Sequence, residues 1–261
     1  MIKGIDVSKH NGKIDWPAVK AGGISFAIIR AGYTHYEGGI TLDERFAENM
    51  EGAAAAGIPV GVYAYGYDLS AAAAEISAVK VMDAIRPYRL EYPVYYDQEY
   101  EEKTLALSKQ TRTSICKAFM AAVQDAGYYT GLYASREWLE NKVDGSQLAE
   151  YDKWVAAYRR DLPEPGKAAS GYDGAHGMWQ YTVIGTIGTK GKHYWTYGSV
   201  PGVPGNCDLN TAYKDYPAII RAAGMNHLGD VNKMITISAD EYAVLLDKAD
   251  RYDRITALVA K

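Results

Sequence analysis

Cysteine is scarce in this chain of 261 residues, in which only Cys116 and Cys207 occur. Two thiols this far apart in the sequence form no metal-binding or redox motif. Cys116 lies within an apolar helical pattern, where a free cysteine behaves as a small buried hydrophobe. We therefore expect Cys116 to be buried and inert, and nothing in the cysteine content requires an oxidising compartment.

Long apolar runs are also missing. No stretch reaches the roughly 18 apolar residues of a membrane-spanning helix, so we expect no contact with a membrane. The N-terminal sequence MIKGIDVSKHNG contains no charged region followed by an apolar run, so we expect no signal peptide.

A strong charge of either sign is absent as well. The formal net charge is −4, which argues against a nucleic-acid-binding protein, because such proteins usually carry a basic face. The same balance leaves little non-specific attraction to anionic polymers. Binding to such a polymer would have to come from a specific groove.

Phenylalanine occurs only 3 times, against 23 tyrosines and 5 tryptophans. Phenylalanine is a pure core residue, whereas tyrosine combines an apolar ring with a polar hydroxyl. A tyrosine-rich surface suits sugar binding, in which the ring stacks on a pyranose and the hydroxyl bonds its substituents. Alternatively, the tyrosines fill half-buried positions on strands. Composition leaves both interpretations open.

The chain is 48% apolar, which is enough for one large core. Short apolar strands alternate with helical patterns through the first 158 residues. Strands are expected at 3–7, 26–31, 59–67, 93–97, 130–134 and 153–158, with helices opening at Asp15 and Ser135 and spanning 43–56, 70–85 and 109–126. Later strands at 178–183 and 207–210 have no full helix between them, and 185–197 is expected to form a hairpin region before a helix at 217–223. We expect an α/β fold, namely an irregular TIM-like (β/α) barrel.

The C-terminal segment is expected to be separate from a barrel at residues 1–225. Residues 226–236 are expected to form a linker and 237–261 an amphipathic helix. Ser238 with Glu241 three residues later is a capping-box pattern. Such a helix could pack on the barrel, self-associate, or be a remnant of a lost module.

Polar and aromatic residues gather where the expected strands end. They are Asp6, Tyr63, Tyr65, Asp97, Glu99, Tyr133, Trp179, Gln180 and Asp208. A single Asp at a strand end is usually a turn or cap residue. In (β/α) barrels, however, the carboxyl ends of the strands form the active site. The convergence of several carboxylates and aromatic rings at one rim therefore predicts a functional cleft.

Asp97 and Glu99 form the chemical centre of this prediction. Residues i and i+2 of an extended segment point to the same face, so both carboxylates project into one cleft. Glycoside hydrolysis uses such a pair, one as general acid and the other as base, nucleophile or electrostatic partner. Glu99 reaches farther, which favours it as the acid/base. The acidic run that includes Glu101 and Glu102 could instead be a solvated loop, and a carboxylate cluster could also bind Mg²⁺ or Ca²⁺.

Several segments together resemble glycoside hydrolase family 25, the Chalaropsis-type lysozymes that include many phage endolysins. The matching segments, in order, are Gly4–Ser8, Asn11-Gly12, Ile14–Trp16, Phe26–Ala31, Gly61–Tyr65, Asp97-Gln98-Glu99, Trp179–Tyr181 and Asp208–Asn210. The resemblance covers about residues 1–225. One departure is Gln98, where the family usually has an apolar residue; on a strand Gln98 points away from the cleft, so we expect an effect on packing only.

The resemblance implies a (β/α)₅β₃ barrel that hydrolyses the β-1,4 bond between N-acetylmuramic acid and N-acetylglucosamine in bacterial peptidoglycan. By similarity, Glu99 is the general acid/base and Asp97 assists, as nucleophile or by supporting the substrate's acetamido group. Asp6 and Asp208 occupy further acidic positions of the cleft. The expected sugar-binding residues are Tyr63, Tyr65, Tyr133, Trp179 and Gln180. We expect no metal ion and no cofactor.

Two other functions remain open from the sequence. A catalytically silent barrel would bind wall glycan without turnover, and a metal-dependent hydrolase would depend on a divalent cation. The expected partner is peptidoglycan, with self-association through the C-terminal helix as a further possibility. We expect a phage lysin without a signal peptide to be made in the host cytoplasm and then released to the cell wall. Secretion by a non-classical route is the alternative.

Overall fold

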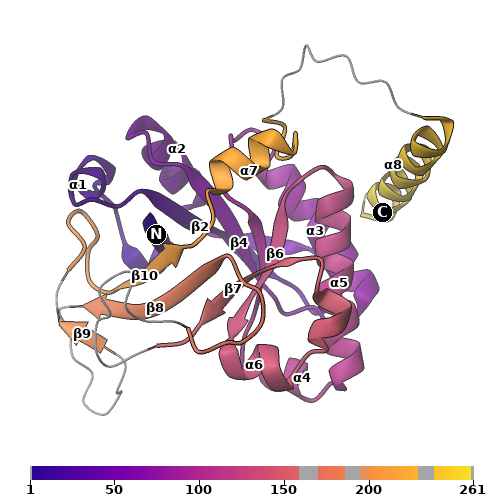
Figure 1. The fold of residues 1–261 in the computed structure, drawn as a ribbon, viewed down its shortest axis with the longest axis horizontal. Coiled ribbons are helices and arrows are strands. Elements are labelled where there is room, and N and C mark those ends of the chain that lie inside the picture. The colour runs from indigo at the N-terminus through magenta and orange to yellow at the C-terminus, as the bar shows by residue number, and fades with distance from the viewer. Residues whose placement is uncertain (1, 159–169, 186–194, 198, 229–237, 260–261) are drawn as a thin grey trace.

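The computed structural model describes residues 2–158, 170–185, 195–197, 199–228 and 238–259 (Figure 1). Five strand–helix pairs come first: β1 (Ile2–Val7) with α1 (Trp16–Ala21), β2 (Phe26–Thr34) with α2 (Phe46–Ala55), β4 (Val60–Tyr65) with α3 (Ala71–Ile85), β5 (Val94–Gln98) with α5 (Lys109–Asp125), and β6 (Thr130–Ser135) with α6 (Arg136–Asn141). Three strands follow, β7 (Asp152–Ala156), β8 (Met178–Gly185) and β10 (Cys207–Ala212). The remaining elements are β3 (Ile40–Leu42), β9 (Trp195–Tyr197), α4 (Glu102–Leu105), α7 (Tyr216–Ala222), α8 (Ala239–Val259) and the 3-10 turns Lys9–Asn11 and Gly145–Leu148.

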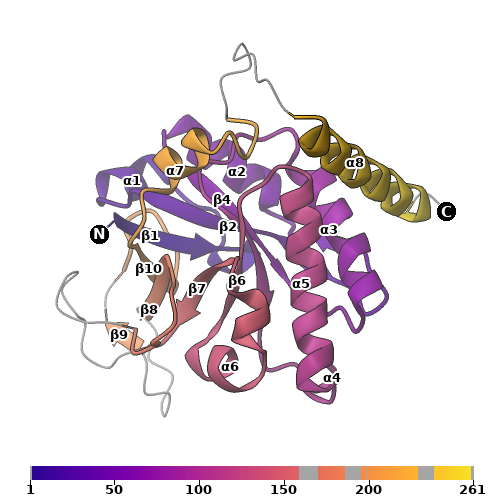
Figure 2. The ribbon, with the colours of Figure 1, turned by 45° about the vertical axis from the view of Figure 1, so that its right-hand side comes forward.

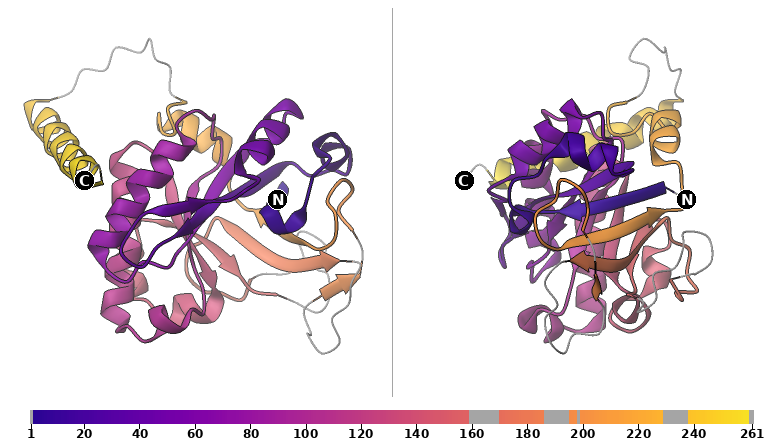
Figure 3. Two further views of the ribbon diagram at one scale, coloured as in Figure 1. Left: turned by 180° about the vertical axis from the view of Figure 1, so that it is seen from behind. Right: turned by 90° about the vertical axis from the view of Figure 1, so that its left-hand side faces the viewer.

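Eight strands close into a barrel in the order β1-β10-β8-β7-β6-β5-β4-β2, and β2 pairs back with β1. β10 runs antiparallel to both of its neighbours, β1 and β8. The other neighbours around the barrel are parallel. Figure 3 shows β1, in indigo, lying beside β10, in orange. The structure thus confirms the expected irregular (β/α)₅β₃ barrel.

Side chains alternate along the strands between two apolar cores. One set, which includes Ile29 and Val62, packs between the sheet and the surrounding helices, against residues such as Phe119 of α5. The other, which includes Ile28 and Trp154, fills the barrel interior. Figure 2 shows α3 and α5 side by side against the outside of the barrel. This alternation places every second residue of a strand toward the barrel axis, where a site can form.

The helix starts follow the local sequence signals. The side chain of Asp15 accepts a hydrogen bond from Ala18 N at the start of α1, and Ser135 Oγ accepts one from Trp138 N at the start of α6. Each oxygen satisfies a backbone N–H that has no partner within its own helix. Ser135 is also the last residue of β6, so its cap fixes the point at which that strand passes into α6.

Two predictions for local structure were incomplete. The sequence did not predict β3, which pairs antiparallel with β2, or the short α4. Most of the expected hairpin region, 186–194, lies outside the described residues. β9 pairs parallel with β8, so these two strands are not the antiparallel arms of a hairpin.

Asn226, expected to begin a linker, belongs to the barrel. Its side chain is buried, and Nδ2 donates to the carbonyls of Leu90 and Tyr92, both at 3.1 Å. Its Oδ1 accepts from Tyr129 N at 2.7 Å. Asn226 also has a φ of +52°, in the left-handed region that asparagine tolerates better than most residues. The barrel therefore extends beyond residue 225.

The capping box of α8 has formed. Ser238 N donates to Glu241 Oε2 at 2.7 Å, and Glu241 N donates to Ser238 Oγ at 3.2 Å. The second half of α8 lies against the barrel, where Arg251 pairs with Glu75 of α3 at 2.7 Å and with Asp125 of α5 at 3.3 Å. The first half exposes Tyr242, Val244, Leu245 and Leu246. Packing on the barrel thus describes part of the helix, and self-association stays a prediction.

Replacing Asn226 with Ala should destabilise the barrel. A buried polar group left without its partner costs about 1–3 kcal/mol, and a left-handed backbone conformation costs Ala about 1 kcal/mol more. We expect the melting temperature to fall by about 5–10 °C in a thermal melt. Asn226→Gly removes only the amide, and Gln124→Ala, at an exposed position of α5, is the control. An unchanged melting temperature for Asn226→Ala would show that this amide does not hold the barrel together.

Candidate active site

The barrel places four acidic side chains at one end, the carboxyl ends of its parallel strands. Asp6 of β1 is the direct neighbour of Asp208 of β10, because the antiparallel register pairs these two residues. Asp97 lies near the end of β5, and Glu99 follows that strand by one residue. The sequence prediction that these carboxylates converge is thus met by strand order and register.

Asp6 is the centre of a buried hydrogen-bond network. Its Oδ2 accepts from Gln180 Nε2 of β8 at 2.9 Å and from Asn210 Nδ2 of β10 at 2.7 Å. Gln180 Oε1 in turn accepts from the hydroxyls of Tyr133 at 2.7 Å and Tyr158 at 2.8 Å. Gln180 and Tyr133 are therefore held in fixed orientations by the same network.

Asp208 and Asp6 are costly to ionise together. Burial, followed by the neighbouring Asp6 carboxyl, raises the pKa of Asp208 well above its usual range, while a hydrogen bond from Tyr158 at 3.3 Å opposes the shift. Burial also raises the pKa of Asp6 to about 6, although the amides of Asn210 and Gln180 favour its charged form. The pair consequently holds protons at a pH where ordinary carboxyls have lost them.

Asp97 is 3% exposed. Burial raises its pKa well above the usual range, and the charges of Glu99 and Asp6 add to the shift. Oδ1 of Asp97 has no hydrogen-bond partner within the described part of the chain. A buried oxygen without a partner is unusual in a folded protein, and this one lies two residues before Glu99 in the chain.

Gln98, between the two acids, points the other way. Its Nε2 donates to the carbonyl of Gly66 at 3.3 Å, and its side chain is 1% exposed. Tyr96, two residues earlier on the same face, stacks on Phe119 of α5. Gln98 therefore belongs to the layer between sheet and helices, in agreement with the expectation that it affects packing.

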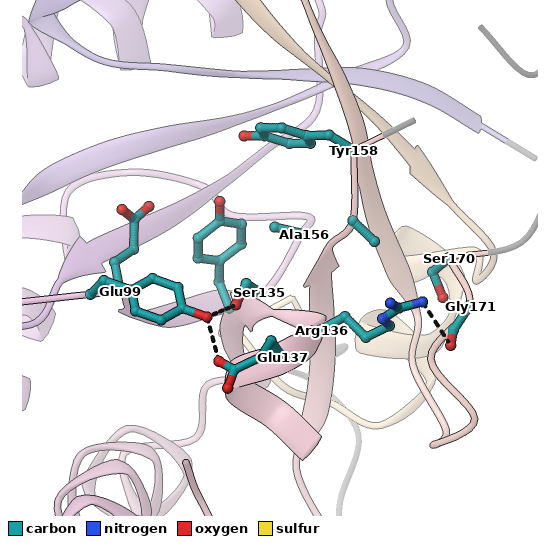
Figure 4. Close-up of a pocket in the computed structure, with 11 residues that line it drawn as sticks. Glu99, Ser135, Arg136, Glu137, Ala156, Tyr158, Ser170 and Gly171 are labelled. Carbon is teal, nitrogen blue, oxygen red and sulfur yellow. Dashed lines mark hydrogen bonds between the residues drawn. The ribbon is translucent and has the colours of Figure 1, made fainter. Parts of the chain in front are cut away.

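Glu99 opens into a cleft of about 660 Å³ between the ends of β5, β6 and β7. Figure 4 shows Glu99, just after β5, and Tyr158, just after β7, reaching into this cleft, with Arg136 and Gly171 at its other end. Burial raises the pKa of Glu99, and the charges of Asp6 and Glu101 raise it further. A partly exposed carboxyl with a raised pKa is suited to donate a proton.

Tyr63 and Tyr65 lie two residues apart on β4, on the face of the strand that points toward the acidic side chains. Burial raises the pKa of the Tyr63 hydroxyl, and the charges of Asp6 and Asp97 contribute, so Tyr63 lies among the carboxylates. Tyr65 donates a hydrogen bond to Glu101 Oε1 at 2.7 Å. Glu101, which the sequence alternatively placed in a solvated acidic loop, is therefore half-buried and hydrogen-bonded, whereas Glu102 is exposed.

The structure does not bring Trp179 to the cleft. Trp179 precedes Gln180 on β8, so the two side chains point to opposite faces. Its indole Nε1 donates to the carbonyl of Ala157 at 3.0 Å, and the ring is 2% exposed in the layer outside the barrel. The sequence prediction that Trp179 binds sugar is therefore wrong.

Three residues of the site were missed. They are Tyr158, Asn210 and Arg30, of which Arg30 opposes the upward pKa shift of Asp97 and is held by Asp43 at 2.7 Å. Tyr158 comes two residues after the end of β7. The rule that the ends of the strands line the site, which found Tyr133 on β6, could therefore have found Tyr158 as well. Nothing in the sequence pairs Arg30 with Asp43, because that contact depends on the tertiary fold.

The described residues contain no group of three or more His, Cys, Asp or Glu side chains placed to hold a metal ion. None of the described helices is both long and apolar enough to span a bilayer. Both cysteines are free and buried, as expected for Cys116.

Comparison with known sequences identifies relatives. The family model described as "Glycosyl hydrolases family 25" matches residues 5–189. Lysozyme M1 of Streptomyces globisporus is 45% identical over 62 residues, which are 24% of this chain and 20% of that protein. The uncharacterized protein YegX of Escherichia coli O157:H7 is 26% identical over 215 residues, covering 80% of this chain and 68% of YegX.

Solved structures share the fold. The modular autolysin LytC from Streptococcus pneumoniae, in complex with a synthetic peptidoglycan ligand, has a TM-score of 0.64 at 28% identity. That match covers 81% of this chain, which thus spans less than half of the autolysin, 46%. The bacterial lysozyme from Streptomyces coelicolor matches in fold with a TM-score of 0.62 at 22% identity, over 87% of this chain and 98% of that one.

The family model spans more than half of the chain and includes the strands that position Asp6, Asp97 and Glu99. The chain therefore belongs to glycosyl hydrolase family 25, a family of glycoside hydrolases.

Proposed function

We propose that this protein is a lysozyme that hydrolyses the β-1,4 bond between N-acetylmuramic acid and N-acetylglucosamine in bacterial peptidoglycan. The observation that most supports this is Glu99, a partly exposed carboxyl of raised pKa that opens into the cleft beside the buried carboxyl of Asp97. Family membership and the match to lysozyme M1 point to the same substrate.

Glu99 serves as the general acid/base in this proposal. It protonates the glycosidic oxygen as the bond to the leaving sugar breaks, and the resulting carboxylate then takes a proton from the water that attacks the anomeric carbon. The raised pKa keeps the acid protonated before each turnover.

Asp97 assists at the same centre. A buried ionised carboxylate is costly by itself, but positive charge that develops on the sugar during cleavage offsets this cost. The unpartnered Oδ1 can face either the anomeric carbon, as a nucleophile, or the substrate's acetamido group, which would then close on the anomeric carbon with Asp97 stabilising its charge. The depth of Asp97, at 3% exposure, favours the second role.

Four other groups surround the reacting sugar in the proposed complex. Tyr63, Tyr65, Tyr133 and Gln180 contact it, and Asp6 and Asp208 position Gln180 and Tyr158 through the hydrogen bonds described above.

The proposed place of action is the bacterial wall, reached after release from a host cell, as the endolysins among the structures of similar fold suggest.

Glu99→Gln should abolish hydrolysis, because the amide cannot transfer a proton. We expect release of new reducing ends from purified peptidoglycan to fall by about 10²–10⁴-fold, the usual contribution of a general acid. Glu102→Gln, at an exposed neighbour on α4, is the matched control and should retain activity. A Glu99→Gln protein that is folded and fully active would overturn the assignment.

A wild-type protein that binds walls but releases no reducing ends would instead be the silent glycan-binding barrel. Activity that disappears with a chelator and returns with a divalent cation would identify a metal-dependent hydrolase.

Glu101→Gln should change the pH profile. The Glu101 carboxylate raises the pKa of Glu99, and a general acid works only while protonated, so a raised pKa extends activity toward higher pH. Removing the charge should lower the pKa of Glu99 and move the alkaline limb of the rate to lower pH. A kcat profile between pH 4 and 9 measures this shift, with Glu102→Gln again as control. A limb that stays in place would show that Glu101 does not influence the acid.

The products distinguish which bond is cut. Mass spectrometry of digested, reduced peptidoglycan should find muramic acid at the new reducing ends. Glucosamine at these ends would mean that the enzyme is a glucosaminidase, and the bond assignment would fail while the glycosidase assignment stood.

A further inference from the structure

Four tyrosine rings form a continuous strip that leads away from the active site. Tyr65 lies 5.1 Å from Tyr67, measured between ring centroids. Tyr67 meets Tyr33 at 6.1 Å and Tyr36 at 6.0 Å, in both cases edge-on at 88°. The strip thus begins at Tyr65, beside the catalytic acids, and ends at Tyr36, in the loop between β2 and β3.

The strip is aligned with the catalytic pair by strand register. Tyr33 of β2 pairs with Tyr65 of β4, and Tyr65 pairs with Asp97 of β5. Residues paired across neighbouring strands point to the same face of a sheet. Tyr33 is therefore in the same row as Asp97, two strands away from it.

The outer rings are exposed although they are large and partly apolar. Tyr33 is 40% exposed and Tyr36 is 42% exposed. Lys103 of α4 places its ammonium over one face of the Tyr36 ring, 3.9 Å from the centroid, a contact that orients the ring. The strip thus presents aromatic surface to solvent next to the site.

A buried scaffold holds the strip in place. Thr34 Oγ1 accepts from Tyr67 N at 2.8 Å and donates to Asp68 at 2.7 Å. The loop that carries Tyr36 is fixed at Gly39, whose carbonyl accepts from Ser77 Oγ of α3 at 3.0 Å. Surface that is ordered before binding loses little entropy when a ligand arrives, so this rigidity suits recognition.

We propose that Tyr33, Tyr36 and Tyr67 form a platform that binds sugar units of the glycan strand beyond the cleavage site. The proposal rests on the proposed function. The cleft at Glu99 extends toward Arg136 and Gly171, over β6 and β7, whereas the platform lies on the other side of Asp97, over β2 and β4. A glycan strand that crosses the catalytic pair would occupy both sides, with pyranose faces on the tyrosine rings and hydroxyls within reach of theirs.

The occupant follows from this continuity. A polymer already held at Glu99 must leave the site in two directions along the rim, and the tyrosine strip follows one of them. The platform should therefore strengthen the binding of long glycan strands. It should not affect a short oligosaccharide, which ends before it reaches the tyrosines.

The test compares two substrates with the double variant Tyr33→Ala/Tyr36→Ala. For purified glycan strands we expect KM to rise about tenfold, as for the loss of two stacked rings, with kcat nearly unchanged. For a tetrasaccharide of alternating N-acetylglucosamine and N-acetylmuramic acid, kcat/KM should change less than about twofold. The ratio of the two effects is the readout.

Two further variants make the result specific. Tyr33→Phe/Tyr36→Phe keeps the rings and should restore most of the preference for strands. Tyr213→Ala removes a tyrosine of similar exposure, 39%, just after β10, whose last residue Ala212 pairs with Ile2 at the opposite end of the barrel; it should leave both substrates unaffected.

Equal losses on the two substrates, or an unchanged KM for strands, would overturn the platform. If the wild type cleaves neither substrate, the proposed function fails by itself. Binding of labelled glycan strands to the Glu99→Gln protein, with and without the two tyrosines, then still tests the platform, which requires weaker binding without them.

Discussion

The site depends on one carboxylate oxygen, Oδ2 of Asp6, which accepts amide hydrogen bonds from Gln180 and Asn210. Gln180 lies on β8 and Asn210 on β10, and β10 closes the barrel by pairing antiparallel with β1, the strand of Asp6. The hydrogen bonds to Asp6 therefore lie where the barrel closes, and they also orient the side chain of Gln180 in the site. Because Gln180 then holds Tyr133 and Tyr158, the orientation is passed on to β6 and β7.

This arrangement concentrates negative charge where it is least favourable. Burial raises the pKa values of Asp97, Glu99 and Asp208, and neighbouring carboxylates raise them further. A fold selected only for stability would avoid such a cluster, and departures of this kind are expected at functional sites. The amides and hydroxyls around Asp6 and the Arg30 guanidinium reduce the cost. In the proposed mechanism, the part of the pKa shift that remains on Glu99 is what suits this carboxyl to donate a proton.

Sequence patterns predicted the barrel well because the helical and the strand periodicity can each be recognised within a short segment. Capping residues such as Ser135 and the short apolar runs indicate where helices and strands begin. The errors came from information that is not local. The sequence predicts both Trp179 and Gln180 in the cleft, although consecutive residues of a strand point to opposite faces. Only the pairing of β8 with β10 shows that Gln180 points inward. Asn226 appeared to belong to a linker because its partners, Leu90, Tyr92 and Tyr129, are about 100 residues or more away in the chain.

The abundance of tyrosine has two interpretations, sugar binding and the filling of half-buried strand positions, and the structure shows that some of the rings are core residues. Tyr96 is fully buried, and its hydroxyl donates to Asp68 at 2.7 Å; likewise Tyr216 donates to Asp152 at 2.7 Å. These hydroxyls tie strands to neighbouring segments, which phenylalanine could not do without leaving the carboxylates unpaired. Tyr33 and Tyr36 have no such duty in the core and remain exposed beside the site. The same residue type therefore serves the interior through its hydroxyl and, in the proposed platform, the glycan through its ring.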